Sequence, residues 1–506
     1  MQQEKYNRRT YKMKKKLLVS MLAAVIAASA LTGCGITDSD HTEKTSAKTV
    51  KLDPEDPVPL TVWHYYNGLQ QTAFDNLVDE FNNTVGKDKG IFVKSYSQGS
   101  VADLEKAITD AADGLVGADK MPDIFSSYAD VAYTIEKKSG LADLSQYFTE
   151  EELSEYVDSY IREGYFEGNK ALYLFPVAKS TEIMMINKTD WEPFASAAGV
   201  TLDQLSTLEG VREVAEKYYD WTDAMTPDVA DDGKAFYGRD AMANYFIIGM
   251  KQLGKDLFQV KDGKVTVDTD KESIRRLWDN YYEPYIMGYF AAFGKFRSDD
   301  VKTGDILAYT GSTASAMYFP DKVEDDDESY AIDYIVQDAP ILKAGRNHKV
   351  QQGAGMAVAK SDEKHEYASS VFLKWFTQKE QNLRFVCESA YLPVQKDANT
   401  IKALDQVVKE NSIDISQKAY DCLKDTMDSF DKTEFYTSAC FENSYSARQI
   451  LEHNLSDKAA ADKAAIDEKV ASGISRKEAA AEYLTDQAFD QWYEEFCKAL
   501  SASVEK

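Results

Sequence analysis

The sequence LTVWHYYNGLQQTAFDNLVDEF (residues 60–81) predicts the fold class of this chain. Residues 60–63 predict a short buried strand, residues 65–68 an aromatic turn, and residues 69–81 a helix with Phe74, Leu77, Val78 and Phe81 on one face. Strand, loop and helix in this order are typical of an α/β domain. Ligands of open α/β sheets bind beyond the carboxyl ends of strands, so residues 63–67 lie where a small molecule is expected. Trp63 is interpreted either as a core residue or as a ligand contact, because large aromatic side chains are mostly buried.

The pattern of strand and helix continues downstream. Residues 91–94 predict a strand, residues 101–115 a helix, and residues 122–125 another strand. The predicted helix buries Leu104, Ile108, Ala111 and Leu115. Repeated βα units indicate a parallel or mixed sheet. The polar residues that follow the last strand are expected at the same sheet edge as the Trp63 turn; they are Ser126, Ser127, Tyr128 and Asp130.

A second informative stretch is FPVAKSTEIMMINK, residues 175–188. Pro176 disfavours a helix, and residues 183–186 form an apolar run that predicts a strand. Lys179, Ser180, Thr181 and Glu182 form a polar patch between them. We interpret this patch as the first crossing of the chain between two domains.

Other polar positions follow predicted strands or begin predicted helices. Asp240 either caps a helix or accepts hydrogen bonds from ligand hydroxyls. Residues 311–318 form a turn of small residues, whose N–H groups and hydroxyls could meet a polar ligand, and residues 391–394 are extended. Aromatic rings can stack on the C–H face of a sugar while carboxylates, amides and hydroxyls bind its rim. Peptides or amino acids could use the same groups.

The N-terminal region predicts export. An apolar run at residues 17–31 follows three lysines, Lys14, Lys15 and Lys16, and precedes LTGC. These features are typical of a secretory signal peptide. The LTGC sequence resembles a bacterial lipobox, in which Cys34 is lipidated and becomes the first mature residue. Residues 34–59 are then expected to form a flexible tether on the outer face of the cytoplasmic membrane, and Met13 is an alternative start.

Composition limits the remaining possibilities. A chain of 506 residues with 44% hydrophobic residues can form two sizeable domains. The longest apolar run is shorter than the roughly 20 residues of a membrane span, which argues against a channel. Removal of residues 1–33 changes the formal net charge from −27 to −33. Such a polyanion is a poor partner for nucleic acid.

No known catalytic or metal motif is found in the sequence. The five histidines are scattered, and G-x-S-x-G and phosphate-loop motifs are missing. The many acids provide carboxylate pairs by chance, and none stands out as a glycosidase dyad. We therefore predict no enzyme activity, no cofactor and no metal. Four further cysteines, at positions 387, 422, 440 and 497, are compatible with disulfides or with buried thiols.

In combination, the segments resemble the extracellular solute-binding proteins of ABC importers, in the carbohydrate-binding family that includes the maltose-binding proteins. The resemblance covers about residues 60–394. Its motifs, in order, are LTGC, LTVWHYYNG, PDIFSSYADVAY, SGLADL, FPVAKSTEIMMINK, KTGDILAYTGSTASAMYFP, GAGMAVAK, FLKWF and YLPV.

The resemblance implies a type II periplasmic-binding-protein fold, in which two α/β lobes enclose a ligand cleft and the C-terminal part is helical. One lobe is expected to contain residues 60–181 and 309–352, and the other residues 182–308 and 353–506. The implied ligand contacts are Trp63, Tyr65, Asn67, Ser127, Tyr128, Asp130, Ser180, Thr181, Asp240, Ser312, Thr313, Tyr318 and Tyr391.

One departure concerns the maltose-type GPWAW pattern, whose second half here is Ser312-Thr313-Ala314-Ser315. The stacking ring expected there is missing, which counts against maltodextrin specificity. The implied function is capture of a sugar or oligosaccharide by a lipid-anchored monomer, followed by delivery to the transmembrane subunits of an ABC permease. The alternatives are a lipid-anchored glycan hydrolase and a peptide-binding or sensory protein.

Overall fold

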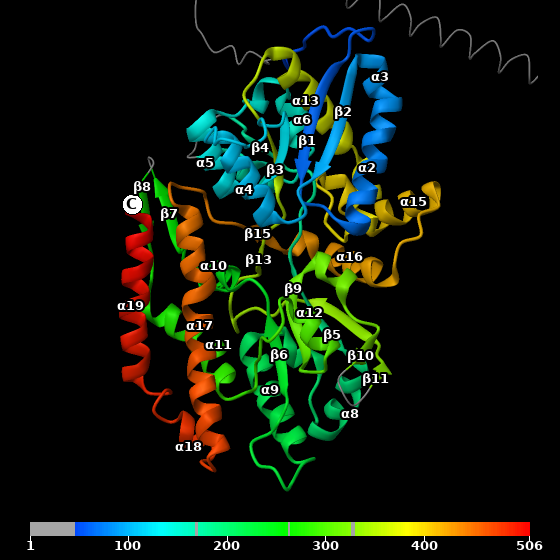
Figure 1. The fold of residues 1–506 in the computed structure, drawn as a ribbon. Helices are drawn as coiled ribbons and strands as arrows, with labels where there is room; N and C mark the ends of the chain where they lie inside the picture. The colour runs from blue at the N-terminus through cyan, green and yellow to red at the C-terminus, as the bar shows by residue number, and fades with distance from the viewer. Residues whose placement is uncertain (1–45, 167–170, 262–263, 325–328, 506) are drawn as a thin grey trace, which may run out of the picture. The chain divides into compact units, whose positions relative to one another are not determined.

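The structure, a computed structural model, describes residues 46–166, 171–261, 264–324 and 329–505. The predicted signal peptide and Cys34 lie outside the described residues. The sequence also predicts an acidic surface loop at residues 324–328, and most of this loop lies outside them as well. Two mixed β-sheets, each with helices on its faces, form the centres of the described chain (Figure 1). None of the described helices has the length and hydrophobicity needed to cross a membrane.

The first sheet has the strand order β2-β1-β3-β14-β4. Its strands are β1 (Val58–His64), β2 (Ile91–Ser97), β3 (Ile124–Ser127), β4 (Leu174–Phe175) and β14 (Gly355–Val358). Strands β2, β1 and β3 are parallel, whereas β14 is antiparallel to both β3 and β4. The carboxyl ends of β1 and β3 therefore lie at one edge, as predicted.

Successive side chains of β1 point to opposite faces of the first sheet, so this sheet separates two hydrophobic cores. Leu60 and Val62 point to one face, where they pack with Phe74 and Phe81 of helix α2 (Gly68–Asn83). Trp63 points to the other face and packs with Leu104, among others. A strand that is apolar on both faces must be covered by helices on both sides. Helices α2 and α13 (Glu363–Phe376) cover one side, and α4 (Val101–Ala112) and α5 (Ala129–Ser139) cover the other.

The second sheet has the order β12-β5-β9-β6. Its strands are β5 (Glu182–Asn187), β6 (Ala235–Arg239), β9 (Ile306–Ser312) and β12 (Tyr334–Asp338). Along β5, Met184 and Ile186 join one core while Ile183 and Met185 join another, as the period of two requires.

Helices near the C-terminus extend the larger of these cores. Helices α17 (Ser444–Ala471) and α19 (Asp486–Val504) run side by side in Figure 1 and contribute Leu451, Leu455, Trp492 and Phe496 to the cluster that contains Met184. The sequence spacing of Phe489, Trp492, Tyr493, Phe496 and Leu500 predicts a last helix with these residues on one face. Helix α19 confirms the helix, and all of these residues except Tyr493 are buried in it.

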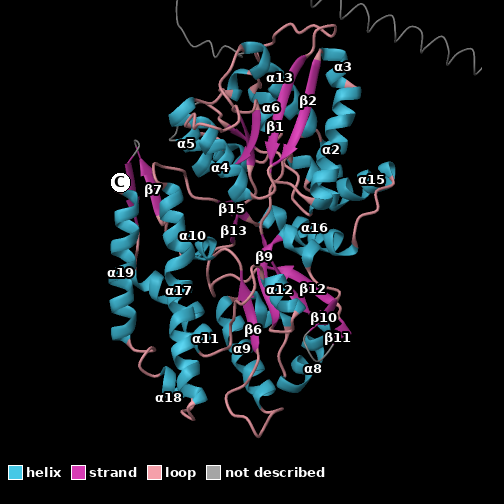
Figure 2. Ribbon diagram, viewed as in Figure 1, coloured by secondary structure: helices cyan, strands magenta, loops and turns pink. Residues whose placement is uncertain are grey.

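Figure 2 shows the remaining elements. The other α-helices are α3 (Val85–Lys89), α6 (Glu150–Ser154), α7 (Asp158–Glu163), α8 (Lys188–Ala198), α9 (Leu208–Asp223), α10 (Met242–Gln252), α11 (Lys271–Ile286), α12 (Arg297–Lys302), α14 (Lys379–Ser389), α15 (Ile401–Asn411), α16 (Gln417–Ser429) and α18 (Arg476–Ala480). The 3-10 helices are η1 (Leu144–Gln146), η3 (Leu202–Ser206), η4 (Thr313–Tyr318), η5 (Lys396–Ala398) and η6 (Phe430–Lys432). The other strands are β7 (Phe258–Lys261), β8 (Lys264–Val267), β10 (Lys322–Glu324), β11 (Ser329–Ala331), β13 (His348–Val350) and β15 (Glu434–Tyr436).

Strand pairing corrects the expected division of the chain. Residues 309–338 were expected in the same lobe as β1, but β9 and β12 pair with β5 in the second sheet. Residues 355–358 were expected in the second lobe, but β14 pairs with β3 in the first. The local patterns predict these strands correctly, but they carry no information about which sheet each one joins.

The predicted tether and one helix boundary also need correction. Residues near Asp53 form a turn, in which Asp56 N donates to Asp53 O at 3.1 Å, and Lys48 pairs with Glu363 at 2.8 Å. The tether therefore does not extend to residue 59. Helix α4 ends at Ala112, so Leu115, predicted to be buried, is 52% exposed.

Candidate ligand-binding site

A cavity of about 450 Å³ lies among residues from both sheets' helices and from the C-terminal segment. This volume is within the range of roughly 300–1,000 Å³ that is usual for small-molecule sites. Four helices contribute residues from their N-terminal halves to its lining: α4, α5, α10 and α17. The polar or aromatic lining residues most relevant to binding are Glu105, Tyr128, Asp130, Glu163, Asn244, Gln351, Gln352, Tyr445 and Arg448.

Glu105 and Asp130 are the two carboxylates of the lining without a basic partner within 4.0 Å among the described residues. Burial raises the pKa of Glu105 to about 7, and the nearby charge of Asp130 contributes to this shift. Burial also raises the pKa of Asp130, although the positive charge of Arg448 partly offsets it. The two acids therefore lie in a poorly solvated part of the cavity.

A hydrogen-bond network of amide and carboxylate side chains connects Arg448 to residues on other elements. Its Nη2 donates to Asn244 Oδ1 at 2.7 Å. Asn244 Nδ2 lies 3.0 Å from Glu182 Oε1 and 3.0 Å from Gln352 Oε1. Glu182 in turn pairs with Arg239 at 3.1 Å, and both side chains are buried. The network connects α17, α10 and β5, so it fixes the position of Arg448.

Two extended segments, one containing Ser180 and the other Gln352, connect the two sheets beside the cavity. Ser180 and Gln352 exchange backbone hydrogen bonds of 2.8 and 3.0 Å. The buried Lys179 pairs with Glu163 at 2.5 Å and donates to Gly353 O at 2.8 Å. Glu163 also accepts from Gln351 Nε2 at 2.5 Å. Cavity residues and connecting segments therefore share hydrogen bonds.

Three lining residues have a buried polar side-chain atom without a hydrogen-bond partner among the described residues, namely Gln351, Ser438 and Ser444, and the atom of Gln351 is an acceptor. The side chain of Gln351 is 3% exposed, and its Oε1 has no hydrogen-bond partner among the described residues. A buried polar atom without a partner destabilises a folded protein, so such an atom beside a cavity indicates where a ligand can donate a hydrogen bond.

Several tyrosines gather at the carboxyl ends of β1 and β3. The hydroxyls of Tyr65 and Tyr391 are 3.3 Å apart. Burial raises the pKa values of Tyr65, Tyr66, Tyr128 and Tyr391, and neighbouring phenol groups raise several of them further. Among these residues, Tyr128 lines the cavity.

Comparison with known proteins agrees with this geometry. Residues 76–412 match the model of a family described as bacterial extracellular solute-binding protein. The chain belongs to this family. Curated protein sequences give no match to the chain.

Solved structures of solute-binding proteins share its fold. The cyclic α-maltosyl-1,6-maltose binding protein from Arthrobacter globiformis is 17% identical, with a TM-score of 0.63, and the match covers 88% of this chain and 99% of that one. UgpB from Mycobacterium tuberculosis, in complex with glycerophosphocholine, is 17% identical, with a TM-score of 0.62 over 88% and 98% of the chains. The ABC substrate-binding protein Lmo0181 from Listeria monocytogenes, in complex with cycloalternan, is 16% identical, with a TM-score of 0.60 over 88% and 100%. The chain therefore has the predicted periplasmic-binding-protein fold.

Two of the residues proposed from the sequence line the cavity of this solute-binding protein, namely Tyr128 and Asp130. Ser180 and Thr181 lie on a connecting segment beside it, both buried, and Ser180 pairs with the lining residue Gln352. Ser127 is buried and donates to Tyr128 O at 2.9 Å. Tyr65 and Tyr391 contact each other as described above.

The other proposed residues lie outside the cavity lining. Trp63 is 7% exposed and packs in the core with Leu104, so of its two interpretations the structure supports the core residue. Asn67 is exposed and Tyr318 is 61% exposed. Ser312 accepts from Ala314 N at 3.3 Å, and Thr313 is fully buried.

Asp240 does not cap α10, which corrects one of its two interpretations. The first N–H groups of α10 donate instead to Glu452, from Met242 N at 3.1 Å and from Ala243 N at 2.9 Å. Asp240 accepts from Arg297 N at 3.3 Å, and burial raises its pKa to about 6. A distant carboxylate on α17 therefore replaces the local cap.

Three cavity residues, Glu105, Gln351 and Arg448, are not marked by any sequence pattern described above. Glu105 and Arg448 occur in helices, where a charged residue is expected to face solvent, and Gln351 directly follows strand β13. The one local signal is the GAG sequence after Gln351, which marks a close approach of two backbones: at Gly353 an added Cβ would lie 3.1 Å from Lys179 Cα.

Cysteine pairing, left open by the sequence, is partly answered. Cys387, Cys422 and Cys497 have free thiols, and burial raises the pKa of Cys387 to about 12. No group of His, Cys, Asp and Glu among the described residues has the arrangement of a metal site.

Proposed function

We propose that this solute-binding protein captures a sugar or oligosaccharide in the cavity lined by Tyr128 and Asp130 and delivers it to the permease of an ABC importer. The observation that carries the proposal is the position of the cavity, since its lining comes from helices on both sheets and from the segments that connect them. Ligand contacts from both sides favour a closed arrangement, so binding shifts the population toward the form that a permease recognises.

The choice of a sugar is supported by the lining and by the structural neighbours. Tyr128 and Tyr445 offer aromatic rings, while Glu105, Asp130 and Gln351 offer hydrogen-bond acceptors. Two of the neighbours named above are described with oligosaccharide ligands. The residues that we propose as sugar contacts are therefore Tyr128, Asp130, Glu105, Gln351 and Arg448, and catalysis forms no part of the proposal.

Attachment to the membrane is a further part of the proposal. LTGC at residues 31–34 provides the lipidation site, with Cys34 as the acylated residue. Two or more acyl chains on one cysteine are enough for stable anchoring. Anchoring places the binding cavity on the outer face of the membrane, close to the permease.

A thermal-shift screen tests the proposed function. The purified protein is heated with mono- and oligosaccharides, amino acids and peptides, each added at increasing concentration. A ligand at 100 times its Kd stabilises the protein by about 2.7 kcal/mol, which gives a clear rise in Tm. We expect a rise with a neutral or charged saccharide and none with peptides.

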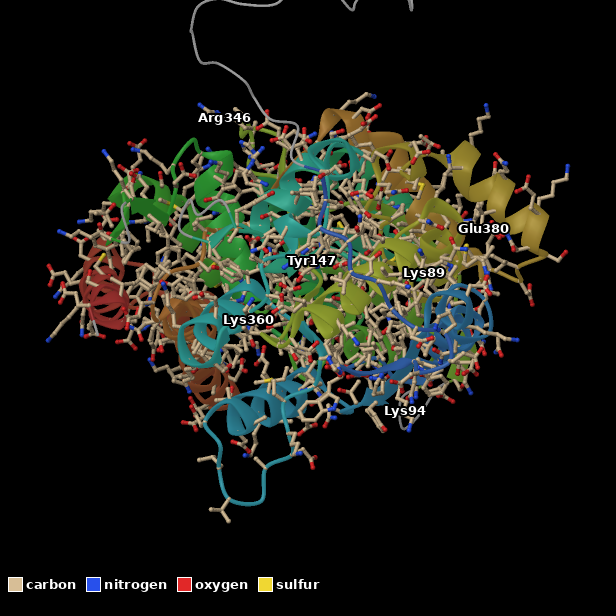
Figure 3. All side chains as sticks on the ribbon, turned by 90° about the horizontal axis from the view of Figure 1, so that it is seen from above. Lys89, Lys94, Tyr147, Arg346, Lys360 and Glu380 are labelled. Atoms are coloured by element: carbon tan, nitrogen blue, oxygen red, sulfur yellow. The ribbon has the colours of Figure 1, made fainter. Side chains whose placement is uncertain are left out.

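Two variants locate the binding event. Arg448→Gln removes the cavity's arginine and should abolish most of the ligand-induced shift. Arg346→Gln is the matched control, because Arg346 is exposed at the surface (Figure 3) and does not line the cavity. Stabilisation by peptides alone, or an equal loss in both variants, would reject the proposal.

A further inference from the structure

The cavity is acidic on one side. Among its described lining residues, Glu105, Asp130 and Glu163 are acidic and Arg448 is basic. Glu163 is neutralised by Lys179 at 2.5 Å. Asp130 accepts a hydrogen bond from Val131 N at 2.9 Å. The positive charge of Arg448 partly offsets the rise in the pKa of Asp130 that burial causes. The Glu105 carboxylate has no hydrogen bond or ion pair with any described residue, so it is the least compensated charge of the cavity.

The arginine compensates Asp130 but is not among the groups that influence Glu105. Arg448 changes the pKa values of Tyr128 and Asp130, and its guanidinium is held by Asn244 at 2.7 Å. The groups that influence Glu105 are its own burial and the charge of Asp130. A positive group placed next to Glu105 would therefore neutralise a carboxylate of the cavity that the arginine leaves uncompensated.

Two aromatic rings border the same acids. Tyr128 and Tyr445 line the cavity together with Glu105 and Asp130, and the charges of both acids raise the pKa values of the two tyrosines. Tyr128 is half-buried and Tyr445 is 47% exposed, which leaves ring surface available at the cavity. Aromatic faces attract cations, and they do so most strongly where water is excluded.

A third observation points to a ligand in the same cavity. Gln351 is 3% exposed, lines the same cavity, and has an Oε1 without a partner among the described residues. Its Nε2 is already used, since it donates to Glu163 and to Ser159 O. The free position is thus an acceptor, and it requires a donor such as an N–H group of the ligand.

We propose that the part of the cavity beside Glu105, Asp130, Tyr128 and Tyr445 binds a positively charged amino group, so that the preferred ligand is an amino sugar or an oligosaccharide that contains one. This inference rests on the proposed sugar-binding function. A bound ammonium neutralises the acids and donates charge-assisted hydrogen bonds to their carboxylates. It also lies against the aromatic faces of the two tyrosines. A neutral sugar could supply hydroxyl donors there, but it would leave the charge of Glu105 uncompensated.

Matched pairs of sugars test the inference by isothermal titration calorimetry with the purified full chain at pH 7. The pairs are glucosamine with glucose, galactosamine with galactose, and the glucosamine trisaccharide with its fully N-acetylated form. In at least one pair we expect the protonated amine to bind about tenfold more tightly than its neutral partner. Glu105→Gln and Asp130→Asn should each reduce this preference several-fold.

Asp110→Asn is the matched control. Asp110 lies on the same helix as Glu105 and carries the same charge, but it pairs with Lys106 at 2.5 Å and does not line the cavity. It should leave the preference unchanged. Equal or tighter binding of the neutral partner in every pair overturns the inference and leaves the proposed function standing. An unchanged preference in Glu105→Gln also overturns it, and failure of every sugar to bind rejects both.

Discussion

Glu163 and Glu105 both line the ligand cavity, and the contrast between their surroundings separates structural charges from charges available to a ligand. Glu163 is bonded to Lys179 and Gln351, and its side chain is 7% exposed. Glu105 has no such partner among the described residues, and burial raises its pKa to about 7. The first carboxylate stabilises the connecting segments, whereas the second is destabilising until something binds it.

Lys179→Met gives the largest expected effect, because it removes the ion-pair partner of the buried Glu163 carboxylate. The substitution leaves Glu163 buried without a counter-charge, and it also removes the hydrogen bond from Lys179 to Gly353 O. Loss of one partner of a buried pair costs about 3–5 kcal/mol. We expect the free energy of unfolding, measured by urea denaturation, to fall by that amount.

The double variant Lys179→Met with Glu163→Gln is the control. It removes the stranded carboxylate, and the glutamine introduced in its place cannot be charged, so much of the lost stability should return. A single variant that loses less than about 1 kcal/mol would show that water reaches the pair in solution. The buried ion pair would then no longer explain the difference between Glu163 and Glu105.

Glu105→Gln should have a smaller effect of the opposite sign. The pKa of Glu105 is raised by folding, so its ionisation costs stability as pH increases from about 4.5 to above 7. Gln carries no such cost. The ligand-free variant should therefore be more stable than the original protein at pH 8, by about 1 kcal/mol for a partly solvated group, and equal to it at pH 4.

Urea denaturation at both pH values measures this difference. Asp110→Asn, which removes only a surface pair on the same helix, should change stability by less than about 0.5 kcal/mol at either pH. If Glu105→Gln were less stable at pH 8, Glu105 would have a favourable partner in solution, and a cationic ligand would gain nothing from it.

Strand alternation and helix capping could be predicted from the sequence, because both depend on the spacing of residues a few positions apart. The period of two in β5 placed Met184 and Ile186 opposite Ile183 and Met185, and both sets are buried. The sequence Thr149-Glu150-Glu151-Glu152 predicts a capping box, and both of its hydrogen bonds are present. These features depend on residues only a few positions apart, so no knowledge of the remainder of the chain is needed.

Pairing between distant segments did not follow in the same way. Strand β14 joins the first sheet beside β3, from which about 230 residues separate it, and its local pattern suits either sheet equally well. The cavity has the same difficulty, because Arg448 and Asp130 belong to helices that are far apart in sequence. Aromatic residues at strand ends were the available signal, and that signal could not distinguish Trp63, which packs in the core, from Tyr128, which lines the cavity.

Tyr65→Phe should have the smallest effect, and it tests whether the tyrosine group belongs to the binding site. The substitution removes one hydroxyl, which lies 3.3 Å from the hydroxyl of Tyr391, so the free energy of unfolding should fall by about 1 kcal/mol or less. Tyr65 does not line the cavity, and ligand affinity measured by calorimetry should therefore be unchanged. A tenfold weaker affinity with unchanged stability would instead place Tyr65 in contact with the ligand, as the family resemblance implies, and would extend the binding surface from the acids of α4 and α5 toward the carboxyl end of β1.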